Sequence, residues 1–131
     1  MPVQYNILDR GFRNLREQGA VIGFQVALRD GYYRGIYLPL IDSFEVTVDG
    51  QIFQGQQIRC KFRDHVYAQS DLQNHPDERW QWQEPCTLMV AKPGGLKPGF
   101  HEVKIVVKER ISYMPTIPTV RAFVAKLALV S

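Results

Sequence analysis

The chain lacks most of the sequence features that mark a self-contained enzyme, a membrane protein or a nucleic-acid binder. Its 131 residues contain no phosphate-binding glycine loop, no GxSxG motif and no HExxH motif. Its apolar runs are too short to cross a bilayer as a helix. The 16 basic and 13 acidic residues are interspersed, with no long run of one sign. This pattern is typical of a solvated surface rather than a nucleic-acid interface.

Cysteine is also scarce. Cys60 and Cys86 are the two cysteines, and their spacing is neither CxxC nor that of a metal site. The segment Met1–Asn6 has no basic start and no apolar stretch of the kind found in a secretory signal. We therefore expect a cytoplasmic protein whose two thiols are reduced and buried on core strands.

The strongest positive signal is a turn-rich corner that leads into an alternating strand. Residues 93–101 hold two prolines and three glycines, which favour turns and end a sheet ladder. In residues 102–110 apolar and charged side chains then alternate with period two, as in a strand with one buried face. The buried face would carry Val103, Ile105 and Val107, opposite Glu102, Lys104 and Lys108.

Within this corner the spacing of Leu96, Pro98, Gly99 and His101 resembles the tyrosine corner of immunoglobulin-like sandwiches, with histidine in the tyrosine position. In that motif the ring packs inward and its polar tip bonds nearby backbone. An imidazole can do the same. We therefore interpret His101 as a structural pin and not as a catalytic base.

Further strand signals recur along the chain. Residues 42–53 predict a hairpin, because two extended runs flank Asp49-Gly50, a favoured two-residue turn. Residues 120–129 suit a helix or a closing strand, and the strand agrees better with the rest. Residues 71–78 are polar and broken by proline, which predicts a loop. Other short strands are expected over residues 8–14, 23–29, 57–63, 79–82 and 86–91. The pattern predicts one all-β domain over residues 1–131, an antiparallel immunoglobulin-like or fibronectin-like sandwich of about seven to nine strands.

No catalytic or metal constellation emerges from the residues. His65, His75 and His101 are scattered, and the His75–Glu78 segment is more typical of a polar loop than of a metal site. We therefore assign no catalytic residue and no metal ligand to this chain.

Three groups of residues suit binding. Tyr32, Tyr33 and Arg34 supply apolar area and planar donors of the kind enriched at interfaces, although one of two adjacent tyrosines in a strand would face the core. Arg110 and Tyr113 follow the long strand. Trp80 and Trp82 would share a strand face, one as a core plug and the other, Trp82, exposed to sugar or protein.

In their order along the chain, these motifs resemble the small β subunit of C-glycoside deglycosidases. The resemblance runs from about Gly23 to Pro115 and does not include the first twenty residues or the tail after Pro118. It is carried by Gly23-Phe24-Gln25, Tyr32-Tyr33-Arg34-Gly35, Val46-x-Val48-Asp49-Gly50, Arg79-Trp80, Lys92-Pro93-Gly94-Gly95-Leu96-x-Pro98-Gly99-x-His101 and Arg110-Ile111-Ser112-Tyr113-x-Pro115.

The resemblance implies a heteromeric carbon–carbon lyase. Its α subunit would be a TIM barrel that holds a divalent metal, Mn²⁺, and acts on 3-oxo-C-glycosides of flavonoids and related aromatics. The present chain would be inactive alone, with no cofactor of its own. Tyr32, Tyr33, Arg34, Trp82, Arg110 and Tyr113 would line the partner interface or the substrate entrance. The alternative is a stand-alone carbohydrate-binding or interaction sandwich with a tryptophan platform.

Overall fold

The computed structural model describes residues 6–29, 36–81, 83–110 and 118–130, and strands dominate these ranges. Every strand pairing among them is antiparallel. The prediction of an all-β fold is therefore confirmed. The strands are β1 (Ile7–Glu17), β2 (Ala20–Arg29), β3 (Ile36–Tyr37), β4 (Ile41–Val48), β5 (Gln51–Gln54), β6 (Ile58–Phe62), β7 (His65–Ala68), β8 (Arg79–Trp80), β9 (Pro85–Ala91), β10 (Gly99–Arg110) and β11 (Pro118–Leu129).

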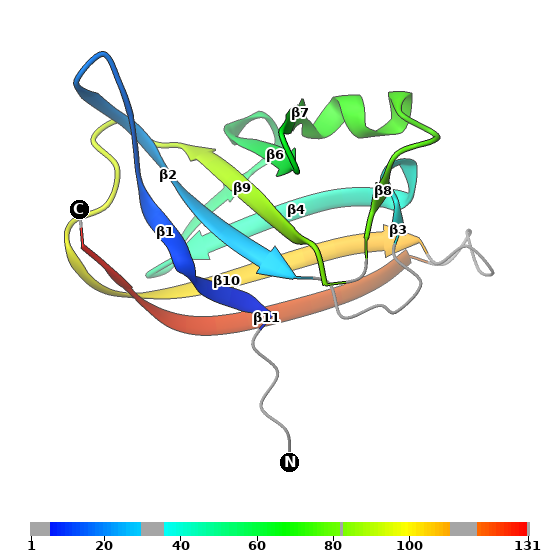
Figure 1. The fold of residues 1–131 in the computed structure, drawn as a ribbon. Helices are drawn as coiled ribbons and strands as arrows, with labels where there is room; N and C mark the ends of the chain where they lie inside the picture. Colours follow the sequence, from blue (N-terminus) through cyan, green and yellow to red (C-terminus); the bar gives the residue numbers. More distant parts are fainter. Residues whose placement is uncertain (1–5, 30–35, 82, 111–117, 131) are drawn as a thin grey trace.

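Two main sheets face each other as a sandwich (Figure 1). One sheet has five strands in the order β1-β2-β9-β6-β7, and the other has four in the order β11-β10-β4-β5. A two-stranded ribbon joins β3 to β8. The strands β1 and β11 are thus edge strands of opposite sheets, and they lie close together in space.

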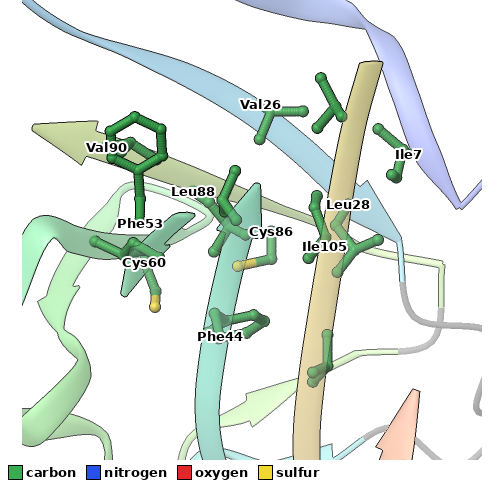
Figure 2. Close-up of a cluster of buried hydrophobic side chains, with 14 of the residues drawn as sticks. Ile7, Val26, Leu28, Phe44, Phe53, Cys60, Cys86, Leu88, Val90 and Ile105 are labelled. Carbon is green, nitrogen blue, oxygen red and sulfur yellow. The ribbon is translucent and has the colours of Figure 1, made fainter. Parts of the chain in front are cut away.

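The core fills the space between the two sheets with aliphatic and aromatic side chains. Figure 2 shows Val26, Leu88 and Val90 of one sheet facing Phe44 and Ile105 of the other. Cys60 and Cys86 lie in the same cluster, and both are free thiols, as predicted. Burial raises the pKa of Cys86 well above its usual range, and its contact with Cys60 adds to the shift.

The local signals of the second sheet are confirmed. The hairpin β4–β5 turns at Asp49 and Gly50, whose φ angles of 50° and 89° are those of the turn type that Asp-Gly favours. On β10 the odd-numbered residues from Val103 to Glu109 are buried. Residues 118–129 form the closing strand β11, which pairs with β10 along its whole length.

Three predictions about local structure need correction. The first strand is longer than residues 8–14, because β1 runs from Ile7 to Glu17 and pairs with β2 around the turn at Gln18-Gly19. Part of the predicted loop 71–78 belongs to a 3₁₀ helix, Gln69–Asn74, which buries Leu72 against the core. The strand over residues 79–82 ends at Trp80.

Two shorter 3₁₀ turns complete the described elements, at Leu38–Leu40 and Gly55–Gln57. No helix in the described ranges is both long and apolar enough to cross a membrane.

Candidate partner interface

Of the six residues predicted to line an interface, the structure describes one, Arg110. The other five, Tyr32, Tyr33, Arg34, Trp82 and Tyr113, lie outside the described residues.

Arg110 is the last residue of β10, and Asp42 of the neighbouring strand β4 holds its side chain. The Nε–H of Arg110 donates to both carboxylate oxygens of Asp42, at 3.1 and 3.2 Å. The Arg110 side chain is nevertheless 43% exposed. An ion pair this exposed contributes little to stability, in the range of about 0–1 kcal/mol. The main effect of the Arg110–Asp42 pair is to orient the half-exposed guanidinium of Arg110 at the end of the sandwich.

A buried ion pair lies next to Arg110. Glu109 faces the sandwich interior, is only 2% exposed, and pairs with Arg121 of β11. Sequence reasoning missed this pair. The signal was available, since Glu109 has the same parity as the buried Val103, Ile105 and Val107, so period two places its carboxylate inside. A carboxylate in such a place is stable only with a cationic partner.

The ribbon β3–β8 places a basic group beside an aromatic one. The guanidinium of Arg79 stacks on the ring of exposed Tyr37, 5.0 Å from its centroid. Trp80 is 1% exposed, and its indole packs against Phe44 and Phe62. The indole N–H donates to the Glu84 carbonyl at 2.6 Å. Trp80 is therefore a core residue.

A second ion-pair network, which the sequence did not reveal, joins Arg63 to Glu78 and Glu84. Arg63 donates to the Glu84 carboxylate at 2.7 Å and lies 3.4 Å from the Glu78 carboxylate. Arg63 also donates to the backbone carbonyl of Arg79 at 3.3 Å. These contacts hold Glu78, Arg79 and Glu84 against the β6–β7 turn.

At the opposite end of β10, His101 pins the proline-glycine corner. Its Nδ1–H donates to Asp49 Oδ2 and its Nε2–H donates to the Lys97 carbonyl, both at 2.6 Å. Both ring nitrogens face oxygen acceptors, so the doubly protonated imidazolium fits this site best. Burial on its own lowers the pKa of His101, but the bonds to Lys97 and Asp49 outweigh it and the pKa is raised. The bond from His101, followed by one from the Glu102 N–H, lowers the pKa of Asp49.

The remaining corner residues support this arrangement. Gly99 has a φ of 122°, which L side chains rarely adopt, directly before the strand starts its alternation. Asn14 of β1 clamps Leu96 through two bonds, one to its N–H and one to its carbonyl, each 2.9 Å long. Pro98 is exposed. Asn14 was missed from the sequence because the two residues lie far apart along the chain.

The His75–Glu78 segment is structured by bonds within the chain. The His75 ring lies 2.9 Å from the Asp71 carboxylate and packs edge-on against Tyr67. Within the part of the chain that the structure describes, no three His, Cys, Asp or Glu side chains gather as metal ligands would.

These observations define a β-sandwich domain in which several ionisable side chains pair with one another near the strand ends. A family model described as the C-glycoside deglycosidase beta subunit matches residues 3–113. The C-glycoside deglycosidase beta subunit of Eubacterium cellulosolvens is 34% identical over 108 residues, 82% of this chain and 74% of that protein. The 3'-dehydrocarminate deglycosidase beta subunit of a Microbacterium species is 32% identical over 94 residues, 71% of this chain and 70% of that protein. The chain belongs to the C-glycoside deglycosidase beta subunit family.

The extent of this match corrects one expectation from the sequence. The match begins at residue 3, so residues 3–20 are part of the family pattern. Their place in the fold explains why: β1 pairs with β2, and its Asn14 holds the corner at Leu96. The strand β11 lies beyond the matched residues.

Proposed function

We propose that this chain is the non-catalytic β subunit of a heteromeric C-glycoside deglycosidase in the cytoplasm. The observation that carries the proposal is the family match over residues 3–113, supported by two relatives that are themselves named beta subunits. A β subunit requires a second kind of subunit. In this proposal the second subunit is a TIM-barrel α subunit that carries the active site.

The proposed reaction is β-elimination from a 3-oxo-C-glycoside of a flavonoid or related aromatic. A keto group at C3 acidifies the C2 proton, a base removes it, and the resulting enolate expels the aglycone carbon from C1. The aglycone carbon takes up a proton as the C–C bond breaks. A divalent metal on the α subunit, expected to be Mn²⁺, supplies charge stabilisation for the enolate. The name of the Microbacterium relative, which specifies a 3'-dehydro substrate, supports this substrate class.

The role of this chain in the proposal is to stabilise the α subunit and to shape the substrate entrance. Arg110 is suited to this role because Asp42 fixes its half-exposed guanidinium at the end of β10. Tyr32, Tyr33 and Arg34, which follow β2, and Tyr113, which follows β10, remain predicted contacts, as does Trp82. Arginine and tyrosine are enriched at the energetic centres of protein interfaces.

A stand-alone sugar-binding module has less support. Such a module would stack a sugar on an exposed indole, and Trp80 is 1% exposed inside the core. No observation on the described residues favours that function, so we do not propose it.

Gel filtration of this chain with its own α subunit tests the subunit role. We expect the two wild-type chains to co-elute, and Arg34→Ala or Arg110→Ala to weaken the association about tenfold or more. Arg59→Ala is the matched control, because Arg59 is an exposed arginine on β6 of the other sheet. Separate elution of the wild-type chains would refute the subunit role. Unchanged association of both variants would refute only the assignment of these contacts.

A further inference from the structure

The outer face of β10 and β11 carries an unusual share of exposed apolar side chains. Among the described residues, eight large hydrophobic side chains are exposed. Four of them lie on the outer face of the four-stranded sheet: Phe100 on β10, Val120 and Val124 on β11, and Ile52 on β5. Phe100 is 70% exposed and Val124 is 63% exposed.

Register explains why these side chains gather. On β11 the inward positions include the buried Leu127 and Leu129, and the alternate residues point outward. These outward residues would normally be polar on a sheet exposed to water. Here Val120, Ala122 and Val124 follow one another, and Ala122 lies opposite Val106 of β10. We use the name outer β10–β11 face for the surface formed by Phe100, Val106, Val120, Ala122 and Val124.

Among the described residues, the same strand is also unpaired along one backbone edge, although β1 lies close to part of it. β11 is twelve residues long and is the edge strand of its sheet. Within the described ranges no strand pairs with its other side. Long, apolar edge strands promote non-specific association unless something covers them.

A groove continues the surface around this edge. It has a volume of about 820 Å³ and lies between residues 6–9, at the start of β1, and residues 122–127 of β11. The outer surface of β10, β11 and β4 covers about 550 Å², taking β11 as about 40 Å long and three strands as about 14 Å wide. A stable interface needs about 800 Å² per partner. A partner that covers the face and also enters the groove would come closer to that area.

Lysines indicate the charge of the partner. Lys104 and Lys108 are exposed on β10 and flank Val106 on the outer β10–β11 face. Neither forms an ion pair with any residue that the structure describes. Lys126 lies over the Phe100 ring, 5.5 Å from its centroid, opposite Glu102. The fitting partner surface is therefore apolar at its centre with carboxylates at its rim.

From these observations we propose that the outer β10–β11 face and the β11 edge are the surface that docks the α subunit. This inference rests on the proposed function, which supplies the partner. The face reaches one predicted contact, because Arg110 is the last residue of β10 and has the parity of Lys104 and Lys108 on the outer face.

Val124→Asp, measured in the complex of full-length chain and its own α subunit, tests the proposal. The substitution buries a carboxylate against the apolar centre of the partner surface, and we expect at least about a tenfold loss of affinity by calorimetry. Val66→Asp is the matched control, because Val66 is also an exposed valine in a strand, 45% exposed on β7 of the opposite sheet. It should bind like the wild type. Lys104→Glu should weaken the complex as well, more at low salt than at high salt.

The outcomes separate this inference from the proposed function. If the wild-type chain binds the α subunit and Val124→Asp binds equally well, the docking surface is wrong and the subunit role stands. If light scattering shows that the chain alone is a dimer, which Val124→Asp makes monomeric without affecting α binding, the face belongs to a second copy and the proposal is overturned. If the wild-type chain does not bind the α subunit, the proposed function itself fails.

Discussion

Replacing His101 by leucine should destabilise the sandwich without changing its fold. The imidazolium joins two parts of the chain, the Asp49 turn between β4 and β5 and the Lys97 carbonyl of the corner, with two bonds of 2.6 Å. Its edge also packs against the Phe12 ring, 6.1 Å between centroids. Leucine keeps the apolar contact and removes both hydrogen bonds and the charge.

The size of the effect follows from the two bonds. A hydrogen bond that involves a charged group contributes about 1.5–3 kcal/mol when it is shielded. The Asp49 side chain is 52% exposed, so solvent screening reduces that bond to about 1 kcal/mol. With a similar contribution from Lys97, we expect His101→Leu to lower the free energy of unfolding by about 2 kcal/mol. This corresponds to a fall of about 6–10 °C in the melting temperature.

The effect should depend on pH in a defined direction. The folded pKa of His101 lies above its ordinary value of 6.5, so its stabilisation is complete below that pH and is lost as pH rises through the folded value. The folded pKa of Asp49 lies below its ordinary value of 3.8, so its stabilisation is present above that pH and is lost as pH falls through the folded value. The pair therefore stabilises the fold most between about pH 4 and pH 6.5.

Urea unfolding of the wild type, His101→Leu, Asp49→Asn and the double variant measures the coupling between the two side chains. Asparagine tolerates the positive φ of position 49 and keeps an acceptor for the Glu102 N–H, so Asp49→Asn removes mainly the charge. We expect a coupling of about 1 kcal/mol at pH 5.5 that shrinks steadily toward pH 9. A coupling that stays constant between pH 5.5 and pH 9 would refute the imidazolium assignment.

Three further substitutions or probes test the packing. Gly23→Ala should cost more than about 3 kcal/mol, because a Cβ there would lie 2.0 Å from the Val90 carbonyl oxygen, whereas the control Gly19→Ala meets no atom and should cost about 1 kcal/mol from its positive φ. Trp80→Ala should cost about 3–5 kcal/mol by calorimetry, because the indole is buried and bonded to Glu84. Thiol reagents should label Cys86 only after unfolding, since its thiol is buried with a raised pKa. Equal costs of the two glycine variants, a neutral Trp80→Ala or fast labelling of the native protein would each contradict the corresponding contact.

Local signals in the sequence were enough to predict the hairpin and the long strand of the four-stranded sheet. The hairpin β4–β5 was predictable because Asp49-Gly50 adopts its turn with little help from the rest of the chain. The buried face of β10 was predictable from alternation alone. The strand β11 was ambiguous until its pairing with β10 was known, since alanine and leucine suit either state and the partner strand decides.

Features that depend on distant residues could not be predicted. The 3₁₀ helix Gln69–Asn74 buries one apolar side chain, Leu72, so it has no hydrophobic period to detect. The clamp of Asn14 on Leu96 joins residues 82 positions apart. The pair Glu109–Arg121 was missed for another reason. The alternation of β10 does place Glu109 inside, but a charged residue is rarely buried without a partner, and the sequence does not show that Arg121 is that partner.

The rate of aglycone release from a 3-oxo-C-glycoside, measured as this chain is titrated into its own α subunit, tests the central claim most directly. A β subunit predicts that the rate rises with added chain and saturates at a fixed ratio of the two subunits, while this chain alone gives no release. Full activity of the α subunit without this chain, or release by this chain alone, would contradict the account.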